Sequence, residues 1–374
     1  MNAPNTLAAA VALMTFSFLG ACAGSDAGEA TGGVATLSAV PTFEPDATWP
    51  VLPPDFEWGQ VIGIAADSRG HVWTSSRSVI SEWDPDGNLV QSWSARGPDD
   101  NWQVIHGLFI DHNDFVWTNA RESNLTLKFT RDGQHVLTIG RIDETGGSND
   151  TSLMGRPAEI WVDPADNEVF VADGYGNRRV IVFDGETGAY LRHWGAYGDV
   201  PDDEYRPDPA SQEPSRQLRT PHGIAGSRDG HIYVADRANN RIQAFRQDGT
   251  FVMEKILRPR CAPDDATQVP GCGRDAAFSV GFSHDQAQTF LYVADGGSHV
   301  IVVLRRADLE KVAEFGAPGT GPGGLGRPHN LAVGPLGNIF VAEAAGPWIV
   351  NPARGDSVQA GFRAQKFALV GAGM

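Results

Sequence analysis

The chain contains four close copies of one short stretch: VFVADG (169–174), IYVADR (232–237), LYVADG (291–296) and IFVAEA (339–344). Two looser copies are HVWTSSR (71–77) and FVWTNAR (115–121). Short apolar runs rich in Val, Ile, Phe and Tyr, with Gly, Asp or Asn at their ends, are typical of buried β-strands. Six copies of one strand in 374 residues indicate a repeat architecture rather than two or three ordinary domains.

Further strands surround each copy. Most copies are followed by a third strand, such as RVIVFD (179–184) or RIQAFR (241–246), and several then by an Asp-Gly turn, as at Asp86-Gly87, Asp132-Gly133 and Asp248-Gly249. Asp-Gly favours a tight hairpin, and the repeats lack helical periodicity. Four short strands per repeat are the unit of a propeller blade. We therefore predict an all-β fold with four-stranded blades around a central channel.

The first strands of the repeats fix the number of blades. They align as GIAAD (63–67), GLFID (107–111), EIWVD (159–163), GIAGS (223–227), SVGFS (279–283) and NLAVG (330–334). The longest step between neighbouring copies contains the Pro- and Asp-rich insertion 199–219. Six repeats predict a six-bladed β-propeller.

The residue just before each first strand forms a column with three histidines. Blade by blade, the column reads Ile62, His106, Ala158, His222, Phe278 and His329. The innermost strands of a propeller face the channel, so equivalent positions form a ring. Histidines on alternate blades would lie about 120° apart, as in a three-ligand catalytic zinc site with an open position. The alternative is that each histidine only bonds a neighbouring carbonyl; their shared column favours the metal. The other seven histidines, such as His71, fall on turns and are expected to be solvated.

A second column lies where the second strand ends, at the rim of the channel. It reads Arg77, Arg121, Gly174, Arg237, Gly296 and Ala344. The planar guanidinium of arginine suits a carboxylate because it makes paired hydrogen bonds. In blade three Tyr175 follows this position, and nearby positive charge would favour its phenolate and a role as base. Alternatively Tyr175 is a rim aromatic without a chemical role. For Arg121 we expect only a surface salt bridge.

These residues resemble a known family. The segments IHG around His106, DGYGN around Tyr175, TPHG around His222, ADRANNRIQ around Arg237 and RPHN around His329 occur in the order typical of peptidyl-α-hydroxyglycine α-amidating lyases, which are NHL-repeat propellers. The resemblance covers roughly residues 58–345. It implies that the three histidines bind Zn²⁺, that Tyr175 is the base, and that Arg77 and Arg237 assist.

The resemblance also implies a calcium ion on the propeller axis, held partly by the backbone carbonyls of Ile64 and Leu108. Two of the chain's departures from the family bear on the site. Asn330 follows the last histidine where the animal enzymes have a carboxylate, and a neutral amide is a weaker calcium ligand. Arg327 stands where those enzymes have an apolar methionine near the substrate. We therefore expect the zinc set to be kept, calcium to be in doubt, and the substrate pocket to differ.

The N-terminus is typical of an exported lipoprotein. The apolar stretch 7–19 is too short to span a bilayer and ends in Leu19-Gly20-Ala21-Cys22, which resembles a lipobox. We expect lipidation of Cys22, attachment to the cell envelope, and, in a Gram-negative host, the periplasmic face of the outer membrane. The alternative is an ordinary cleaved or an uncleaved signal peptide. The predicted organisation is a signal peptide (1–21), a flexible tether (22–56) and the propeller (57–374).

The other two cysteines, Cys261 and Cys272, are ten residues apart in a turn-rich segment. In an oxidising compartment this spacing favours a loop-stapling disulfide. The net charge of −17 argues against nucleic acid or an anionic membrane surface as a partner, because both reward basic patches. We expect a monomer whose only membrane contact is the lipid anchor.

The resemblance implies a zinc-dependent carbon–nitrogen lyase. Its substrate would be a small molecule or peptide ending in an α-hydroxyglycine-like carbinolamide, and its products an amide and glyoxylate. Two alternatives stay open. One is a non-catalytic NHL scaffold that binds an envelope protein or peptide, which would leave the three histidines unexplained. The other is a zinc hydrolase of an ester or lactone, in which Tyr175 would be dispensable.

Overall fold

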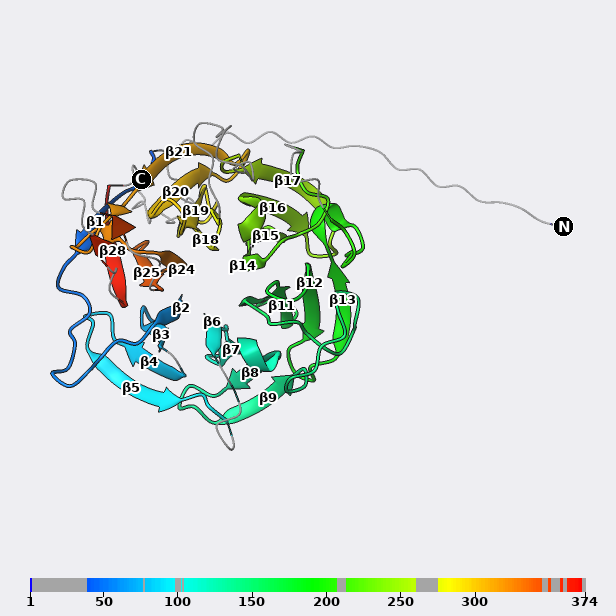
Figure 1. Ribbon diagram of the computed structural model, residues 1–374, viewed down its shortest axis with the longest axis horizontal. Helices are drawn as coiled ribbons and strands as arrows, with labels where there is room; N and C mark the ends of the chain where they lie inside the picture. Colours follow the sequence, from blue (N-terminus) through cyan, green and yellow to red (C-terminus); the bar gives the residue numbers. More distant parts are fainter. Residues whose placement is uncertain are drawn as a thin grey trace. The chain divides into compact units, whose positions relative to one another are not determined.

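Six four-stranded antiparallel sheets surround a central axis (Figure 1). The computed structural model describes Met1 and residues 39–76, 78–97, 102, 104–206, 213–259, 275–344, 349–350, 357–358 and 362–371. The predicted all-β, six-bladed propeller is confirmed, and all six predicted first strands are the innermost strands of their sheets. Cys22, Arg77, Cys261 and Cys272 lie outside the described residues, so their predicted roles stay predictions.

The first three blades follow the chain from the inside outward. Blade one contains β2 (Val61–Ala66), β3 (Val72–Ser76), β4 (Val79–Trp83) and β5 (Leu89–Ser94). Blade two contains β6 (Ile105–Ile110), β7 (Val116–Ala120), β8 (Leu125–Phe129) and β9 (His135–Ile139). Blade three contains β10 (Glu159–Val162), β11 (Glu168–Asp173), β12 (Arg179–Asp184) and β13 (Tyr190–Trp194).

The next two blades repeat this order. Blade four contains β14 (Pro221–Gly226), β15 (His231–Asp236), β16 (Arg241–Arg246) and β17 (Phe251–Ile256). Blade five contains β18 (Ser279–Phe282), β19 (Phe290–Asp295), β20 (Val300–Arg305) and β21 (Glu310–Phe315). Two short pairs lie outside the blades: β22 (Ala317–Pro318) with β23 (Gly324–Leu325), and β26 (Ile349–Val350) with β27 (Ser357–Val358).

Blade six joins the two ends of the chain. Its inner strands are β24 (Pro328–Val333), β25 (Ile339–Glu343) and β28 (Arg363–Gly371), and its outermost strand is β1 (Thr42–Asp46). β1 pairs with β28 in antiparallel register, and Lys366 donates to Asp46 at 2.9 Å. The predicted tether therefore ends too late, because residues 42–46 are part of the propeller. Closing the last blade in this way ties the ring together at the cost of a very long loop.

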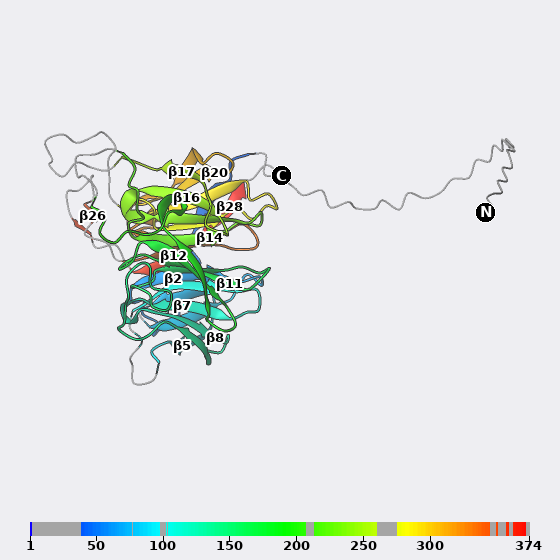
Figure 2. The same ribbon diagram turned by 90° about the vertical axis from the view of Figure 1, so that its right-hand side faces the viewer.

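Burial falls from the axis outward. The three inner strands of blades one and two are buried at nearly every position, as in VWTSS (72–76) of β3 and VWTNA (116–120) of β7. The outer strands β5 and β9 instead expose alternate or most residues. The main apolar clusters lie between adjacent blades; one combines Phe170 and Trp194 of blade three with Val234 and Phe245 of blade four. Figure 2 shows neighbouring blades from the side. This packing makes the inner strands a rigid frame for any site on the axis.

The tight turns behave as their sequences predict. Gly87, Gly133 and Gly249 follow the three Asp residues of the predicted Asp-Gly turns, and all have φ between 84 and 91°, a region that favours glycine. Among the described residues, no helix is long and apolar enough to cross a membrane.

Candidate metal and catalytic centre

Three histidines meet on the axis. His106, His222 and His329 are each the second residue of an innermost strand, β6, β14 and β24. Each strand departs from regular pairing there: Pro221 pairs with Asp236 and Gly223 with Ala235, leaving His222 outside the register, and the same happens at His329. Such β-bulges turn a side chain away from its usual face. Here they place the imidazoles together.

The rings are arranged so that Nδ1 of each bonds the backbone, which leaves Nε2 as the possible metal ligand. The Nδ1 atoms of His106, His222 and His329 lie 2.9, 2.7 and 2.9 Å from the carbonyl oxygens of the next blade's ring residue, which are those of Ala158, Phe278 and Ile62. A carbonyl only accepts, so each Nδ1 carries the proton and each Nε2 offers its lone pair. Each histidine bonds a neighbouring carbonyl, as the alternative interpretation expected, and that bond orients its Nε2; metal binding stays a prediction.

Burial keeps these imidazoles neutral. The three side chains belong to residues that are 2, 2 and 6% exposed. Burial lowers the pKa of His106 and His222 well below its ordinary value, and the neighbouring His329 lowers both further. Burial likewise lowers the pKa of His329 to about 3, with Arg237 and Arg121 contributing. Neutral imidazoles are the form that binds metals.

The donor set fits a transition metal. One ligand atom from each of the three histidines lies within 4.8 Å of the others, and the ring centroids are 4.6–5.0 Å apart. Each imidazole has the second hydrogen bond that orients metal-bound histidines. Three imidazoles suit Zn²⁺ and other late first-row metals. The sequence prediction that these three residues come together is confirmed.

A second group of three, Asp67, His71 and Glu82, also meets within ligand distance. The Arg131 guanidinium bonds both Asp67, at 2.8 Å, and Glu82, and Arg69 lies 3.8 Å from Asp67, so two guanidinium groups offset the two carboxylates. His71 Nδ1 lies 2.7 Å from Glu82 Oε1, and its side chain is 24% exposed. The expectation that His71 is simply solvated is wrong; this group is a structural charge network between blades one and two.

Tyr175 reaches the histidines from the turn between β11 and β12. Its hydroxyl lies 3.2 Å from His106 Nε2 and 3.0 Å from His222 Nε2. Gly174 allows this approach, because an added Cβ would lie 1.9 Å from the Pro221 carbonyl oxygen, next to His222. Asp173 anchors the turn by bonding Asn177 and Arg179 below it. In blade four the same Asp-Asn-Arg network, Asp236 with Asn239 and Arg241, encloses one residue fewer. The extra residue in blade three projects the tyrosine.

Two arginines from the flanking blades hold Tyr175 on either side. Arg237 donates from Nη1 to the Tyr175 hydroxyl at 3.1 Å and from Nε to Asp275 at 3.1 Å. Arg121 lies over the Tyr175 ring, with its guanidinium carbon 4.6 Å from the ring centroid. It also forms the ion pair we expected, with Glu122 at 2.7 Å. Treating Arg121 as a surface residue was nevertheless wrong. Both arginines begin the same 3₁₀ turn, Arg121–Ser123 in blade two and Arg237–Asn239 in blade four.

Two more arginines complete the rim. Arg156 stands two residues before Ala158 in the ring, and its guanidinium carbon lies 5.9 Å from the Tyr175 centroid. Arg327 stands two residues before His329, and lies 5.9 Å from the centroid of Phe278, over which Arg237 also lies, at 4.7 Å. Phe278 in turn contacts His222 and His329, with centroids 5.0 and 5.4 Å apart. The sequence singled out Arg327 as a departure from the family; the structure places it beside Arg237.

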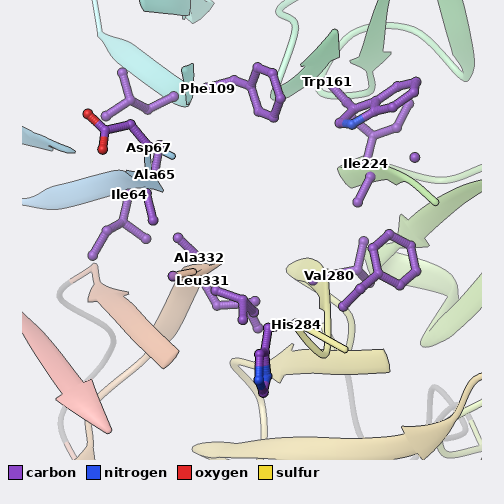
Figure 3. Close-up of a pocket in the computed structure, with 18 of the residues that line it drawn as sticks. Ile64, Ala65, Asp67, Phe109, Trp161, Ile224, Val280, His284, Leu331 and Ala332 are labelled. Carbon is purple, nitrogen blue, oxygen red and sulfur yellow. The ribbon is translucent and has the colours of Figure 1, made fainter. Parts of the chain in front are cut away.

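The residues predicted for calcium lie further along the same inner strands. Ile64 and Leu108 line a cavity of about 460 Å³ on the axis, together with Glu159 (Figure 3 labels Ile64 and other lining residues). Asn330 Nδ2 donates to Glu159 Oε1 at 2.6 Å. Sequence analysis missed Glu159, although it follows Ala158 in the ring and could have been found there. It supplies the anionic oxygen that Asn330 lacks, so these residues fit a hard cation such as Ca²⁺.

Glu159 is buried without a basic partner among the described residues. It is 7% exposed and accepts bonds from Ser279, Ile224 N and Asn330. Burial raises the pKa of Glu159 to about 8, even though these three donors lower it. A carboxyl held in this way is neutral at pH 7 unless a cation joins it.

The fold and the site together define a six-bladed β-propeller with a three-histidine candidate metal site. A family model for the NHL repeat matches residues 218–245, which include His222 and Arg237. The chain is similar to peptidyl-glycine alpha-amidating monooxygenase A of Xenopus laevis, with 35% identity over 123 residues, or 32% of this chain. The match spans 12% of that protein's length. The resemblance seen in the sequence is confirmed over this part.

Solved structures share the fold. A gluconolactonase from Xanthomonas campestris has a TM-score of 0.54 and 14% identity, covering 84% of this chain and 87% of that one. A virginiamycin B lyase from Staphylococcus aureus has a TM-score of 0.51 and 15% identity, covering 88% and 99%. At these identities the likeness concerns the architecture and leaves the chemistry to the site.

Proposed function

We propose that this protein is a zinc-dependent lyase that splits an N-acyl-α-hydroxyglycine into an amide and glyoxylate. One observation carries the proposal: the Tyr175 hydroxyl lies within 3.2 Å of two imidazole Nε2 atoms and of an Arg237 nitrogen. A phenol that contacts both the metal ligands and a fixed positive charge is placed to exchange a proton with a group bound there. The similarity to an amidating monooxygenase supports the choice of reaction.

The metal would be held by His106, His222 and His329 through Nε2. When bound, Zn²⁺ supplies Lewis acidity that makes a hydroxyl proton easier to remove. The protein's own contribution is to keep the imidazoles neutral and fixed. Their Nδ1 bonds to the backbone of the adjoining blades do this without any flexible side chain.

Tyr175 would transfer the proton, and Arg237 would bind the substrate carboxylate. Tyr175 takes the proton from the substrate hydroxyl, whose oxygen then forms the aldehyde carbonyl as the carbon–nitrogen bond breaks. The same proton returns to the departing nitrogen, so the products are a neutral amide and glyoxylate. The substrate carboxylate is on the carbon that bears the hydroxyl, and Arg237 has a nitrogen 3.1 Å from the Tyr175 hydroxyl. Arg237 is therefore in place to bind that carboxylate.

Arg121 favours the same proton transfer from the other side. Its guanidinium lies over the face of the Tyr175 ring, where its positive charge stabilises a phenolate. The contact also fixes the orientation of the ring. Glu122 holds Arg121 in this position at 2.7 Å.

The decisive test offers a synthetic N-acyl-α-hydroxyglycine to the zinc-loaded protein and measures glyoxylate. We expect turnover in the wild type and a loss of about 10²–10⁴-fold in Tyr175→Phe with zinc still bound. Tyr190→Phe, an exposed tyrosine on β13, is the matched control and should keep full activity. Hydrolysis of esters or lactones that does not depend on Tyr175 would instead establish a hydrolase. An intact metal site without activity on either substrate class would favour a binding scaffold.

A further inference from the structure

Positive charge at the rim exceeds the negative charge that pairs with it. Among the residues that the structure describes, four guanidinium groups lie there: Arg121, Arg156, Arg237 and Arg327. Glu122 pairs with Arg121 and Arg156, and Asp275 pairs with Arg237.

Arg327 forms no ion pair and no side-chain hydrogen bond among the described residues, although Asp275 is near enough to act on its charge. Its Nε is buried and makes no hydrogen bond. An unpaired buried donor on a guanidinium is costly, so such a group needs a water, an ion or a ligand as its partner.

The position of Arg327 separates it from the reacting atoms. Arg237 bonds the Tyr175 hydroxyl and is in reach of a carboxylate on the reacting carbon. Arg327 has no such bond; it lies over the Phe278 ring, as Arg237 does, and comes two residues before His329 in the chain. A group bound by Arg327 would therefore belong to the part of the substrate next to the hydroxyglycine.

We propose that Arg327 binds a second anionic group of the substrate, so that the protein prefers acyl-hydroxyglycines with an acidic side chain on the preceding residue. This inference rests on the proposed lyase function. It assigns Arg327 to substrate selection and not to proton transfer. A guanidinium that loses water on contact with a carboxylate discriminates strongly against the uncharged amide analogue, because the amide leaves the arginine unpaired.

Binding of unreactive analogues tests the assignment without turnover. N-acetyl-glutamyl-glycine and N-acetyl-glutaminyl-glycine differ by one charge and lack the hydroxyl, and calorimetry gives their affinities. We expect the wild type to bind the glutamyl analogue about tenfold or more tightly. Arg327→Met should abolish this preference while leaving the glutaminyl affinity nearly unchanged. Arg327→Lys, which keeps the charge but not the planar fork, should retain part of it.

The matched control is Arg305→Met, an exposed arginine on β20 that pairs with Asp308. It should behave as wild type. Equal affinities in the wild type, or a preference that persists in Arg327→Met, would overturn the proposal. An equal loss of both ligands in Arg327→Met would also overturn it, because Arg327 would then bind the shared terminal carboxylate.

Two further measurements keep the outcome decisive. If Arg327→Met does not fold, the wild type alone still decides: N-acetyl-lysyl-glycine must bind more weakly than the glutaminyl analogue. Glyoxylate release from the corresponding hydroxyglycines is measured in parallel. A charge preference in binding without any glyoxylate would reject the lyase function and keep the anion site. Glyoxylate release without a charge preference would do the opposite.

Discussion

At one end of the channel three imidazoles, Tyr175 and four arginines lie close together, whereas further along the same strands two carboxyls, Glu159 and Asp67, line a cavity among many apolar side chains. The two regions are built from equivalent, neighbouring columns: Ala158 and Glu159 are adjacent, as are His329 and Asn330. One region complements an anion and the other a cation. Adjacent ring positions thus reach opposite electrostatic environments with little change of backbone.

The two regions also differ in how the backbone is used. β6, β14 and β24 carry irregular register at their histidines, and β2 does so at Ile62, whereas β10 and β18 pair regularly throughout. Glu159 therefore projects from a regular strand and depends on Asn330, Ser279 and Ile224 N to fix it. The histidine end relies on backbone geometry, and the Glu159 end on side-chain bonds. Substitutions at the two ends should consequently fail in different ways.

The largest expected effect comes from removing one imidazole. His222→Ala should reduce bound zinc from about one equivalent per chain to a small fraction, because two protein ligands hold zinc far more weakly than three. Elemental analysis of the purified protein measures this directly. His193→Ala, a partly exposed histidine on β13, should keep its metal. Full zinc content in His222→Ala would show that the three histidines do not form the zinc site. The wild type should also gain stability on zinc loading, by about 2.7 kcal/mol at a hundredfold excess over Kd.

The next largest effect tests the backbone contact that brings Tyr175 to the histidines. Gly174→Ala would place a Cβ 1.9 Å from the Pro221 carbonyl oxygen, and neither group is a flexible side-chain end. We expect a loss of about 1–3 kcal/mol in the free energy of unfolding and a displaced tyrosine. Gly321→Ala, which meets nothing within 4 Å, is the control for thermal denaturation. Unchanged stability and activity in Gly174→Ala would show that this approach is not what positions Tyr175.

A smaller effect is expected from Arg121, the residue that the sequence analysis placed outside the site. Arg121→Met removes the charge over the Tyr175 ring but leaves the metal ligands and Arg237 in place. Glyoxylate release should fall about threefold to thirtyfold, the value of a cation–π contact. Arg141→Met, an exposed arginine paired with Glu144, should have no effect. If Arg121→Met retains wild-type turnover, its contact with Tyr175 is only structural.

Much of this molecule could be predicted from the chain. The blades can be recognised in the sequence because each inner strand is a continuous apolar run with turn residues at its ends. The same strand pattern recurs in every repeat. The histidine column followed from counting one position before each first strand. Tyr175 and Arg237 were found because they lie at the ends of second strands. In the structure the Arg237 Nη1 atom and the Tyr175 hydroxyl are 3.1 Å apart.

What could not be predicted depends on distant pairing or on local irregularity. β1 (Thr42–Asp46) is short and contains a proline, and its partner β28 is more than 300 residues away, so nothing local marks it as a strand. The register shift at His222 leaves no signature in the sequence. Arg121 was expected to form only a surface salt bridge, and only the folded turn shows that its guanidinium, paired with Glu122, also covers Tyr175.

The smallest effect concerns the Glu159 end and its response to pH. Burial raises the pKa of Glu159 to about 8, whereas the unfolded chain has an ordinary carboxyl. Between these values the native state holds a proton that the unfolded state has lost, so the free energy of unfolding falls as pH rises towards 8. From pH 6 to 7 the contribution of Glu159 should be a loss of about 1 kcal/mol. Glu159→Gln removes this contribution, so the variant should gain stability relative to wild type as pH rises, and exposed Glu186→Gln should not. Thermal denaturation at several pH values measures the difference.

Added Ca²⁺ should stabilise the wild type and flatten the dependence of its stability on pH, because a bound cation favours the carboxylate. It should leave Glu159→Gln unchanged. A pH dependence that is identical in Glu159→Gln and wild type would mean that Glu159 is charged throughout, and the contrast between the two ends of the channel would disappear.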